Sequence, residues 1–201
     1  MRKYLSLLLL LGLLNPWAAG WCADNNLEKI KPAKMDLGFT LPAPQDPTQT
    51  AYLGLDTQDH FLLNQVEAKV LIIEIFSMYC PICQREAADV NKVFDLIQNN
   101  PKLKDQVKLM GIGAGNSAYE VGFFKENYKI QFPLFSDGKF VIHKRIGEVG
   151  TPHFIGLTLY KDKEKEKGKN KGFEIFYSQS GEISDPVQFL ETIIKTSGQK
   201  F

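Results

Sequence analysis

The sequence has few of the residues from which metal sites are built. Its 201 residues include only three cysteines and three histidines. A structural zinc site needs four ligands, so a cysteine pair would need two more. The only other cysteine is Cys22, and His60, His143 and His153 are scattered along the chain. We therefore expect no bound metal and no cofactor.

The sequence also lacks an excess of charge of either sign. It has 24 basic and 23 acidic residues, and loss of residues 1–20 would remove two basic residues and leave a net charge of −1. This balance gives no reason to expect binding to nucleic acid or to an acidic membrane surface. After residue 20, no segment is apolar enough to span a bilayer, which takes about 20 residues.

Phosphate-binding motifs are absent as well. Gly111, Gly113 and Gly115 lack the spacing of a dinucleotide fingerprint, and no Gly-Lys-Ser/Thr follows them. We interpret these glycines as turn and close-packing residues.

The N-terminus has the pattern of a secretory signal peptide. A basic start is followed by a short apolar run, Leu5 to Leu14, and by small residues up to Gly20. We predict a signal peptide over residues 1–20, and an exported, periplasmic protein that is soluble after cleavage. Cys22 is not expected to anchor a lipid, because the bulky Trp21 before it matches a bacterial lipobox only loosely.

Two cysteines lie between a predicted strand and a predicted helix. The run from Val70 to Phe76 is apolar apart from Glu74, which is typical of a strand buried on both faces. Cys80-Pro81-Ile82-Cys83 follows it. Behind these, apolar residues recur at helical spacing as Ala87, Val90, Phe94 and Ile97.

This placement favours redox chemistry. A thiolate at a helix N-terminus is stabilised by unpaired backbone N–H groups and the helix dipole, so the pKa of Cys80 should fall. Cys83 lies one turn further on, where it could attack a mixed disulfide formed by Cys80. A structural disulfide, or half of a zinc site, is the alternative for an isolated Cys-x-x-Cys pair.

The rest of the chain alternates strands and helices, with no repeat and no domain linker. We predict an extended lead-in over 21–37 and a short strand at 39–41 that pairs as a hairpin with 51–55. Residues 60–66 should form a helical turn or an irregular link. Strands are predicted at 107–113, 154–160 and 173–178, a short apolar segment at 132–135, a solvated hairpin loop at 161–172, and helices that begin at Ser117, Phe140 and Asp185.

Pro152 stands at the beginning of a predicted strand. A proline there can simply be the first residue of an edge strand. In a cysteine-pair oxidoreductase it would instead be a cis-proline that faces the two cysteines. The backbone of Thr151 could then pair with an extended substrate segment by strand addition.

The order of these elements resembles the thioredoxin fold over roughly residues 39–195. The N-terminal extension and Gly150-Thr151-Pro152 are similar to those of secreted redoxin/TlpA-type thiol–disulfide oxidoreductases, which are related to the AhpC/TSA superfamily. The resemblance implies an α/β domain over 38–197, in which a central mixed sheet is flanked by helices on both faces and preceded by an N-terminal β extension. It implies that Cys80 is the nucleophile, Cys83 the resolving thiol and Pro152 the cis-proline, with Thr151, Pro81 and Ile82 at the substrate.

Glu74 stands out because a carboxylate in an apolar strand is costly, so its pKa should rise. The stretch from Glu74 to Pro81 also looks like the motif region of DsbA-type oxidases, in which this position holds the buried acid. We expect Glu74 to exchange a proton with Cys83. A strand-end acid that reaches water is the alternative.

The predicted function is disulfide exchange with protein substrates, in the direction of reduction, with electrons from a membrane partner of the thiol-donor type. A DsbA-like oxidase or isomerase, a thiol peroxidase and a metal-binding chaperone are the alternatives. Ile73 and Ser77 occupy the proline and threonine positions of the peroxidase motif, which argues against peroxide reduction. The sequence does not indicate the oligomeric state.

Overall fold

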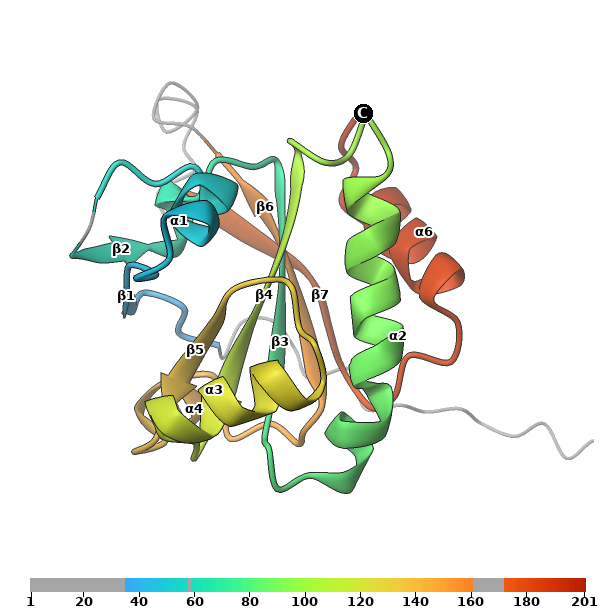
Figure 1. The fold of residues 1–201 in the computed structure, drawn as a ribbon. Coiled ribbons are helices and arrows are strands. Elements are labelled where there is room, and N and C mark those ends of the chain that lie inside the picture. The colour runs from blue at the N-terminus through green and yellow to red at the C-terminus, as the bar shows by residue number, and fades with distance from the viewer. Residues whose placement is uncertain (1–34, 58, 161–171) are drawn as a thin grey trace, which may run out of the picture.

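The computed structural model describes residues 35–57, 59–160 and 172–201, and a five-stranded mixed sheet forms its centre (Figure 1). The strand order is β5-β4-β3-β6-β7. Within this sheet, β3, β4 and β5 are parallel to one another. β6 is antiparallel to β3, and β7 is antiparallel to β6. The strands are β3 (Val70–Phe76), β4 (Val107–Ala114), β5 (Leu134–Asp137), β6 (His153–Leu159) and β7 (Phe173–Ser180).

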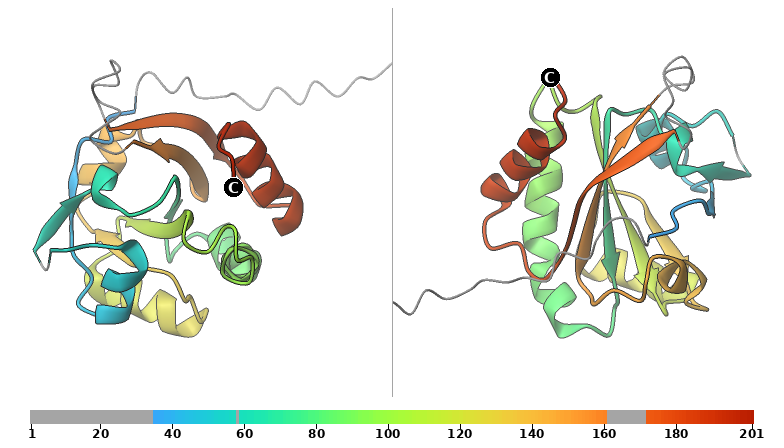
Figure 2. Two further views of the ribbon diagram at one scale, coloured as in Figure 1. Left: turned by 90° about the horizontal axis from the view of Figure 1, so that it is seen from above. Right: turned by 180° about the vertical axis from the view of Figure 1, so that it is seen from behind.

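Helices cover both faces of this sheet, which confirms the predicted architecture. One face carries α2 (Pro81–Gln98), α3 (Ala118–Asn127) and α6 (Pro186–Thr196). The other carries α4 (Val141–Arg145) and the N-terminal elements. Figure 2 shows α2 and α6 side by side on one side of the sheet, with the N-terminal elements on the other.

The apolar run of β3 supplies both layers because successive side chains of a strand point to opposite faces. Ile72 and Phe76 pack against the helices α2 and α3, whereas Ile73 and Ile75 pack toward the N-terminal elements. Glu74 lies in the same alternation as Ile72 and Phe76. Its side chain therefore belongs to the face that α2 covers.

The predicted hairpin between 39–41 and 51–55 is wrong. β1 (Thr40–Pro42) pairs with β2 (His60–Leu62), and most of 51–55 belongs to α1 (Pro47–Leu53). The Asp46 side chain caps this helix by accepting from the backbone N–H of Thr48. A proline after an acidic N-cap, and a left-handed glycine at position 54, are ordinary helix start and stop signals.

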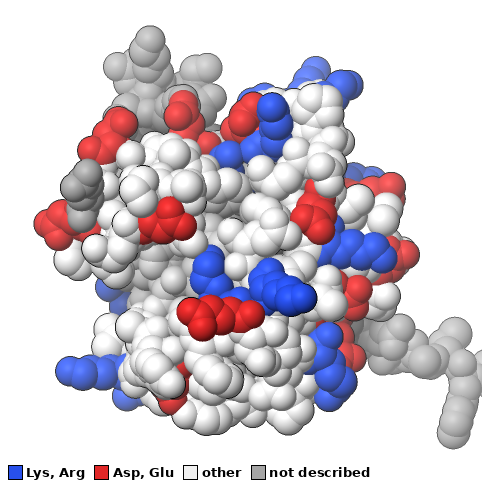
Figure 3. Space-filling view, viewed as in Figure 1, with Lys and Arg blue, Asp and Glu red and all other residues white. Residues whose placement is uncertain are grey.

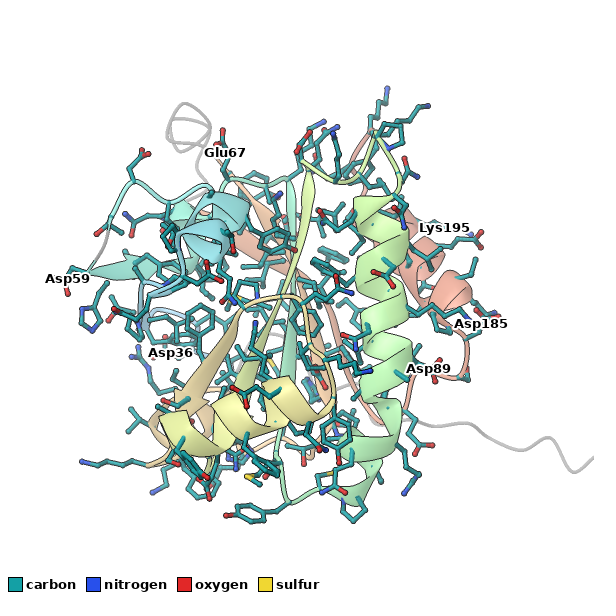
Figure 4. All side chains as sticks on the ribbon, in the orientation of Figure 1. Asp36, Asp59, Glu67, Asp89, Asp185 and Lys195 are labelled. Carbon is teal, nitrogen blue, oxygen red and sulfur yellow. The ribbon has the colours of Figure 1, made fainter. Side chains whose placement is uncertain are left out.

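Three other segments differ from expectation. Residues 60–66 form β2 and the 3₁₀ turn Leu63–Gln65 instead of a helical turn or an irregular link. Val187, Leu190, Ile193 and Ile194 recur at helical spacing, which predicts a buried stripe on α6, but Val187 is exposed and Phe189 is buried there instead. Met35 and Leu37, within the predicted lead-in, pack in the core. Beside them, Asp36 (Figure 4) forms a 2.7 Å ion pair with Arg145 of α4.

The sheet topology brings several loops to one end of the molecule. Because β3, β4 and β5 are parallel, their carboxyl ends lie at the same edge, and α2, α3 and α4 begin just beyond it. Gly115, at this edge, has φ of +69°, and a Cβ there would collide with the ring of Phe140. This contact explains why a glycine is needed at that turn.

Some predictions concern residues outside the described part of the chain. The signal peptide 1–20, Cys22 and nearly all of the predicted loop 161–172 fall there. Within residues 35–57, 59–160 and 172–201, the model contains no helix with both the length and the apolar character needed to cross a membrane.

Candidate active site

Two free thiols lie at the N-terminus of α2, immediately beyond the end of β3. Cys80 is the N-cap residue of the helix, and Pro81 occupies the first helical turn. Cys80 is partly exposed, whereas Cys83 is completely buried. The backbone N–H of Cys83 donates to Cys80 Sγ at 3.4 Å. The predicted start of the helix at the cysteine pair is therefore confirmed.

The surroundings of Cys80 favour its thiolate. Burial alone raises the pKa of this thiol, but hydrogen bonds from the backbone of Cys83 and from the Cys83 side chain oppose it. Further hydrogen bonds from the Thr151 side chain and the Ile82 backbone act in the same direction, and the net result is a lowered pKa. Cys80 is thus suited to act as the nucleophile.

Cys83 has the opposite character. Burial raises the pKa of its thiol well above the usual value, and the negative charges of Glu74 and Cys80 raise it further. A hydrogen bond from the Ser77 backbone offsets only part of this effect. The pKa of Cys80 is thus lowered and that of Cys83 raised, which is the division expected between an attacking and a resolving thiol.

The Thr151–Pro152 peptide bond is cis and lies beside the cysteines. The Cys80 thiol donates to the Thr151 carbonyl oxygen at 3.2 Å. Pro152 is buried and Thr151 is half-buried, while Pro81 and Ile82 on the other side of Cys80 are exposed. A partner that reaches Cys80 would therefore contact both segments.

Glu74 lies in the middle of β3 and is buried, which rules out the alternative of a strand-end acid in water. Burial raises the pKa of its carboxyl to about 8, and the negative charges of Glu86 and Cys80 contribute to the rise. Glu74 in turn raises the pKa of Cys83, so the two groups interact electrostatically. The structure thus brings Glu74, Cys80 and Cys83 together.

Glu86 is a second buried carboxyl that the sequence analysis missed. One of its oxygens accepts a short hydrogen bond from the backbone N–H of Ile183, and the other oxygen has no partner among the described residues. Burial raises the pKa of Glu86 to about 7. The Ile183 N–H lowers it, and the charges of Glu182 and of Asp89 (Figure 4) raise it. Helical periodicity could have found it, because it lies three residues after Cys83 on the buried face of α2.

The loop before Cys80 is held by hydrogen bonds within the loop, to α2, and to Asn116 in the turn after β4. The Met78 backbone N–H donates to the side-chain oxygen of the buried Asn116 at 2.8 Å. The Met78 carbonyl accepts from the Gln84 side chain at 2.7 Å, and the Cys80 N–H donates to the Ser77 carbonyl at 3.0 Å. These hydrogen bonds fix the position of the nucleophile.

Each of the three histidines bonds to residues other than the cysteines. His60 is exposed beside Asp59, and His143 contacts the Val149 carbonyl. His153 is buried, and its ring nitrogens contact the hydroxyls of Ser178 and Ser180. Among the described residues, no group of three or more His, Cys, Asp or Glu side chains is arranged to hold a metal ion.

A family model described as the AhpC/TSA family matches residues 25–167 of the chain. A comparison with curated proteins found no match. Solved structures share the thioredoxin-like fold at low sequence identity. A secreted disulfide oxidoreductase of Mycobacterium tuberculosis, described as homologous to E. coli DsbE, has 17% identity and a TM-score of 0.52, and the match covers 79% of this chain and 96% of that one.

Two further structures extend this comparison. The thioredoxin domain of a thiol–disulfide oxidoreductase from Bacteroides vulgatus has 13% identity and a TM-score of 0.54, over 80% of this chain and 97% of that one. A thioredoxin-like protein from Aeropyrum pernix has 13% identity and a TM-score of 0.51, over 80% and 89% of the two chains. The thioredoxin-like fold predicted from the order of the elements is therefore confirmed.

Proposed function

This chain belongs to the AhpC/TSA family and is an oxidoreductase with a thioredoxin-like fold, and from that premise we propose that it exchanges disulfides with protein substrates through Cys80 and Cys83. The observation that carries the proposal is the unequal environment of the two thiols. The exposed one has a lowered pKa and the buried one a raised pKa. Two thiols of a purely structural disulfide would not need this difference.

In the first step, the Cys80 thiolate attacks one sulfur of a substrate disulfide. A bond forms between Cys80 and that sulfur, and the other substrate sulfur leaves as a thiolate that takes a proton from water. The backbone at Thr151 pairs with an extended segment of the substrate, and Pro81 and Ile82 contact it on the other side. Their positions around the accessible Cys80 sulfur support these roles.

In the second step, Cys83 loses its proton and attacks Cys80 in the mixed disulfide. The substrate sulfur that was bonded to Cys80 leaves as a thiolate that takes a proton from water, and a disulfide between Cys80 and Cys83 remains. Two electrons have then passed from the cysteine pair to the substrate. Glu74 accepts the Cys83 proton in this step, a role supported by its burial and by a pKa of about 8, close to neutrality.

We propose that the protein works in the direction of reduction in an exported, periplasmic compartment. A membrane-bound thiol donor would then restore the two thiols. The basic and apolar N-terminal residues support export, and the TlpA-like order of the elements supports reduction.

Trapping tests the proposed exchange. Cys83→Ser should accumulate a mixed disulfide between Cys80 and a substrate protein, because no thiol is left to resolve it. Cys80→Ser should form none. Equal trapping by the two variants, or none by either, would contradict the assignment.

The reduction potential tests the direction. For a reductase, equilibration of the pair with dithiothreitol buffers should give a value near that of thioredoxin, about −270 mV. A value near that of DsbA, about −120 mV, would make the protein an oxidant.

A further inference from the structure

Large hydrophobic side chains are exposed mainly at one end of the molecule. Eight such residues are exposed in the described part of the chain, and only Leu62 and Val187 lie elsewhere. The other six follow the carboxyl ends of β3, β4 and β5. We call them the apolar rim: Tyr79, Ile82, Tyr119, Phe123, Phe140 and Val141.

The rim is continuous in sequence with the active site. Tyr79 and Ile82 flank the reactive part of the cysteine motif, and the Tyr79 side chain is 65% exposed. The Tyr79 hydroxyl donates to the carboxylate of Glu120 in the first turn of α3. This hydrogen bond joins the cysteine loop directly to the helix that carries the next two members of the rim.

Helix α3 carries apolar side chains on its inner face and also on its outer face. Val121 and Phe124 turn inward and pack in the core. Tyr119 and Phe123 lie four residues apart, so they share the outer face, where they are 82% and 51% exposed. An outward pair of aromatic residues contributes nothing to the core, and such patches mark interaction sites.

Charged side chains leave much of this region uncovered. Figure 3 shows a mostly uncharged area at the bottom of the front face, with acidic and basic side chains along its upper border. Cys80 directly follows Tyr79, whose hydroxyl bonds to Glu120 of α3, so a partner at the Cys80 sulfur lies next to this region.

We propose that the apolar rim on α3, Tyr119 and Phe123, binds an apolar segment of a protein substrate that adjoins the cysteine exchanged with Cys80. The inference rests on the proposed function and names the substrate feature that the site selects. It places recognition on a helix that contributes no atom to the exchange. Selection by the rim can therefore be removed while the chemistry is kept.

Two synthetic peptides provide the probe. Both contain the same intramolecular disulfide, and they differ only in the residues next to one cysteine, Leu-Phe in one and Ser-Asn in the other. Reduced protein should exchange with the Leu-Phe peptide about tenfold faster, as is common for a well-buried aromatic contact. Glutathione disulfide, which is too small to reach α3, serves as the reference substrate.

The variant Tyr119→Ser/Phe123→Ser should lose this preference, while its rates with the Ser-Asn peptide and with glutathione disulfide stay unchanged. Each single variant should lose part of it, and these serve if the double variant folds poorly. Val187→Ser is the matched control, because Val187 is an exposed apolar residue on α6, outside the rim. It should keep the full preference.

Three results would overturn the inference. The wild-type protein could show no preference between the peptides, or the double variant could retain the preference. Sedimentation could also show a wild-type dimer that the double variant cannot form, which would assign the rim to contacts between copies of the chain. Failure of the proposed function is distinct, since glutathione disulfide would then also fail to react.

Discussion

The backbone N–H of Met78 donates a 2.8 Å hydrogen bond to the side-chain oxygen of Asn116. This contact ties the loop before the nucleophile to the junction of β4 and α3, so two parallel strands jointly position Cys80. Asn116→Ala removes the acceptor and leaves a partly buried donor unsatisfied. It should lower the free energy of unfolding of the reduced protein by about 1–3 kcal/mol in urea denaturation.

Asn99→Ala is the control for this prediction, because Asn99 is an exposed residue at the end of α2. Its effect should be much smaller. Equal losses in the two variants would mean that the hydrogen bond of Asn116 contributes nothing specific.

Glu74 should make the reduced protein less stable as the pH rises. Its pKa is about 8 in the folded state, against an ordinary value of 4.5, so between these values the folded protein holds more protons than the unfolded chain. Stability is then lost with rising pH across this window. A glutamine at this position cannot ionise. The free energy of unfolding of Glu74→Gln, relative to that of wild type, should therefore rise by about 2–4 kcal/mol between pH 5 and pH 8.

Urea denaturation at both pH values, in the presence of a phosphine reductant, measures this difference. Glu191→Gln, an exposed acid on α6, should follow wild type at both. Parallel pH profiles for wild type and Glu74→Gln would show that Glu74 titrates normally.

Glu86 should influence the titration of Glu74. The negative charge of Glu86 contributes to the raised pKa of Glu74. Glu86→Gln keeps an oxygen for the Ile183 N–H but removes the charge, so the pKa of Glu74 should fall from about 8. Carboxyl ¹³C chemical shifts of labelled protein measure it directly. An unchanged midpoint would indicate that the two carboxyls do not interact.

His153 should make the protein sensitive to acid. Burial lowers the pKa of its imidazole from 6.5 to about 4, so the unfolded chain binds the additional proton between these values. Stability from this group is therefore lost as the pH falls from about 6.5 to about 4. The free energy of unfolding of His153→Gln should change less than that of wild type across this pH window, by on the order of 1–3 kcal/mol.

Urea denaturation at pH 4.5 and pH 6.5 checks the effect of His153, with His60→Gln as the control at an exposed histidine. If the two histidine variants show the same pH profile, the buried imidazole is not the source of the acid sensitivity.

The elements nearest the cysteines could be predicted because several local signals agree there. An apolar run, a proline at the first helical turn and a helical stripe all place Cys80 at the start of α2. Glu74 could be singled out because it is the one acid within that run. Each of these features is a property of adjacent residues and needs no knowledge of the tertiary structure.

Contacts between distant segments could not be predicted in this way. Helical periodicity places Glu86 on the buried face of α2, but its hydrogen bond to Ile183, far along the chain, is visible only in the folded structure. Asn116 likewise acquires its role from the Met78 backbone, in the loop that follows β3. The error at α1 has another origin, because Asp46 and Gly54 are local cap signals that were outweighed by an apparent β pattern in 51–55.

The separation between the cysteine motif at the start of α2 and the aromatic pair on α3 has a practical consequence for protein engineering. Tyr119 and Phe123 are exposed and lie on a helix whose core contacts come from other residues. A library that randomises these two positions would vary the docking surface while the electron-transferring sulfurs stay in place. Variants with new substrate specificities could therefore be selected from this one protein without a change in its redox chemistry.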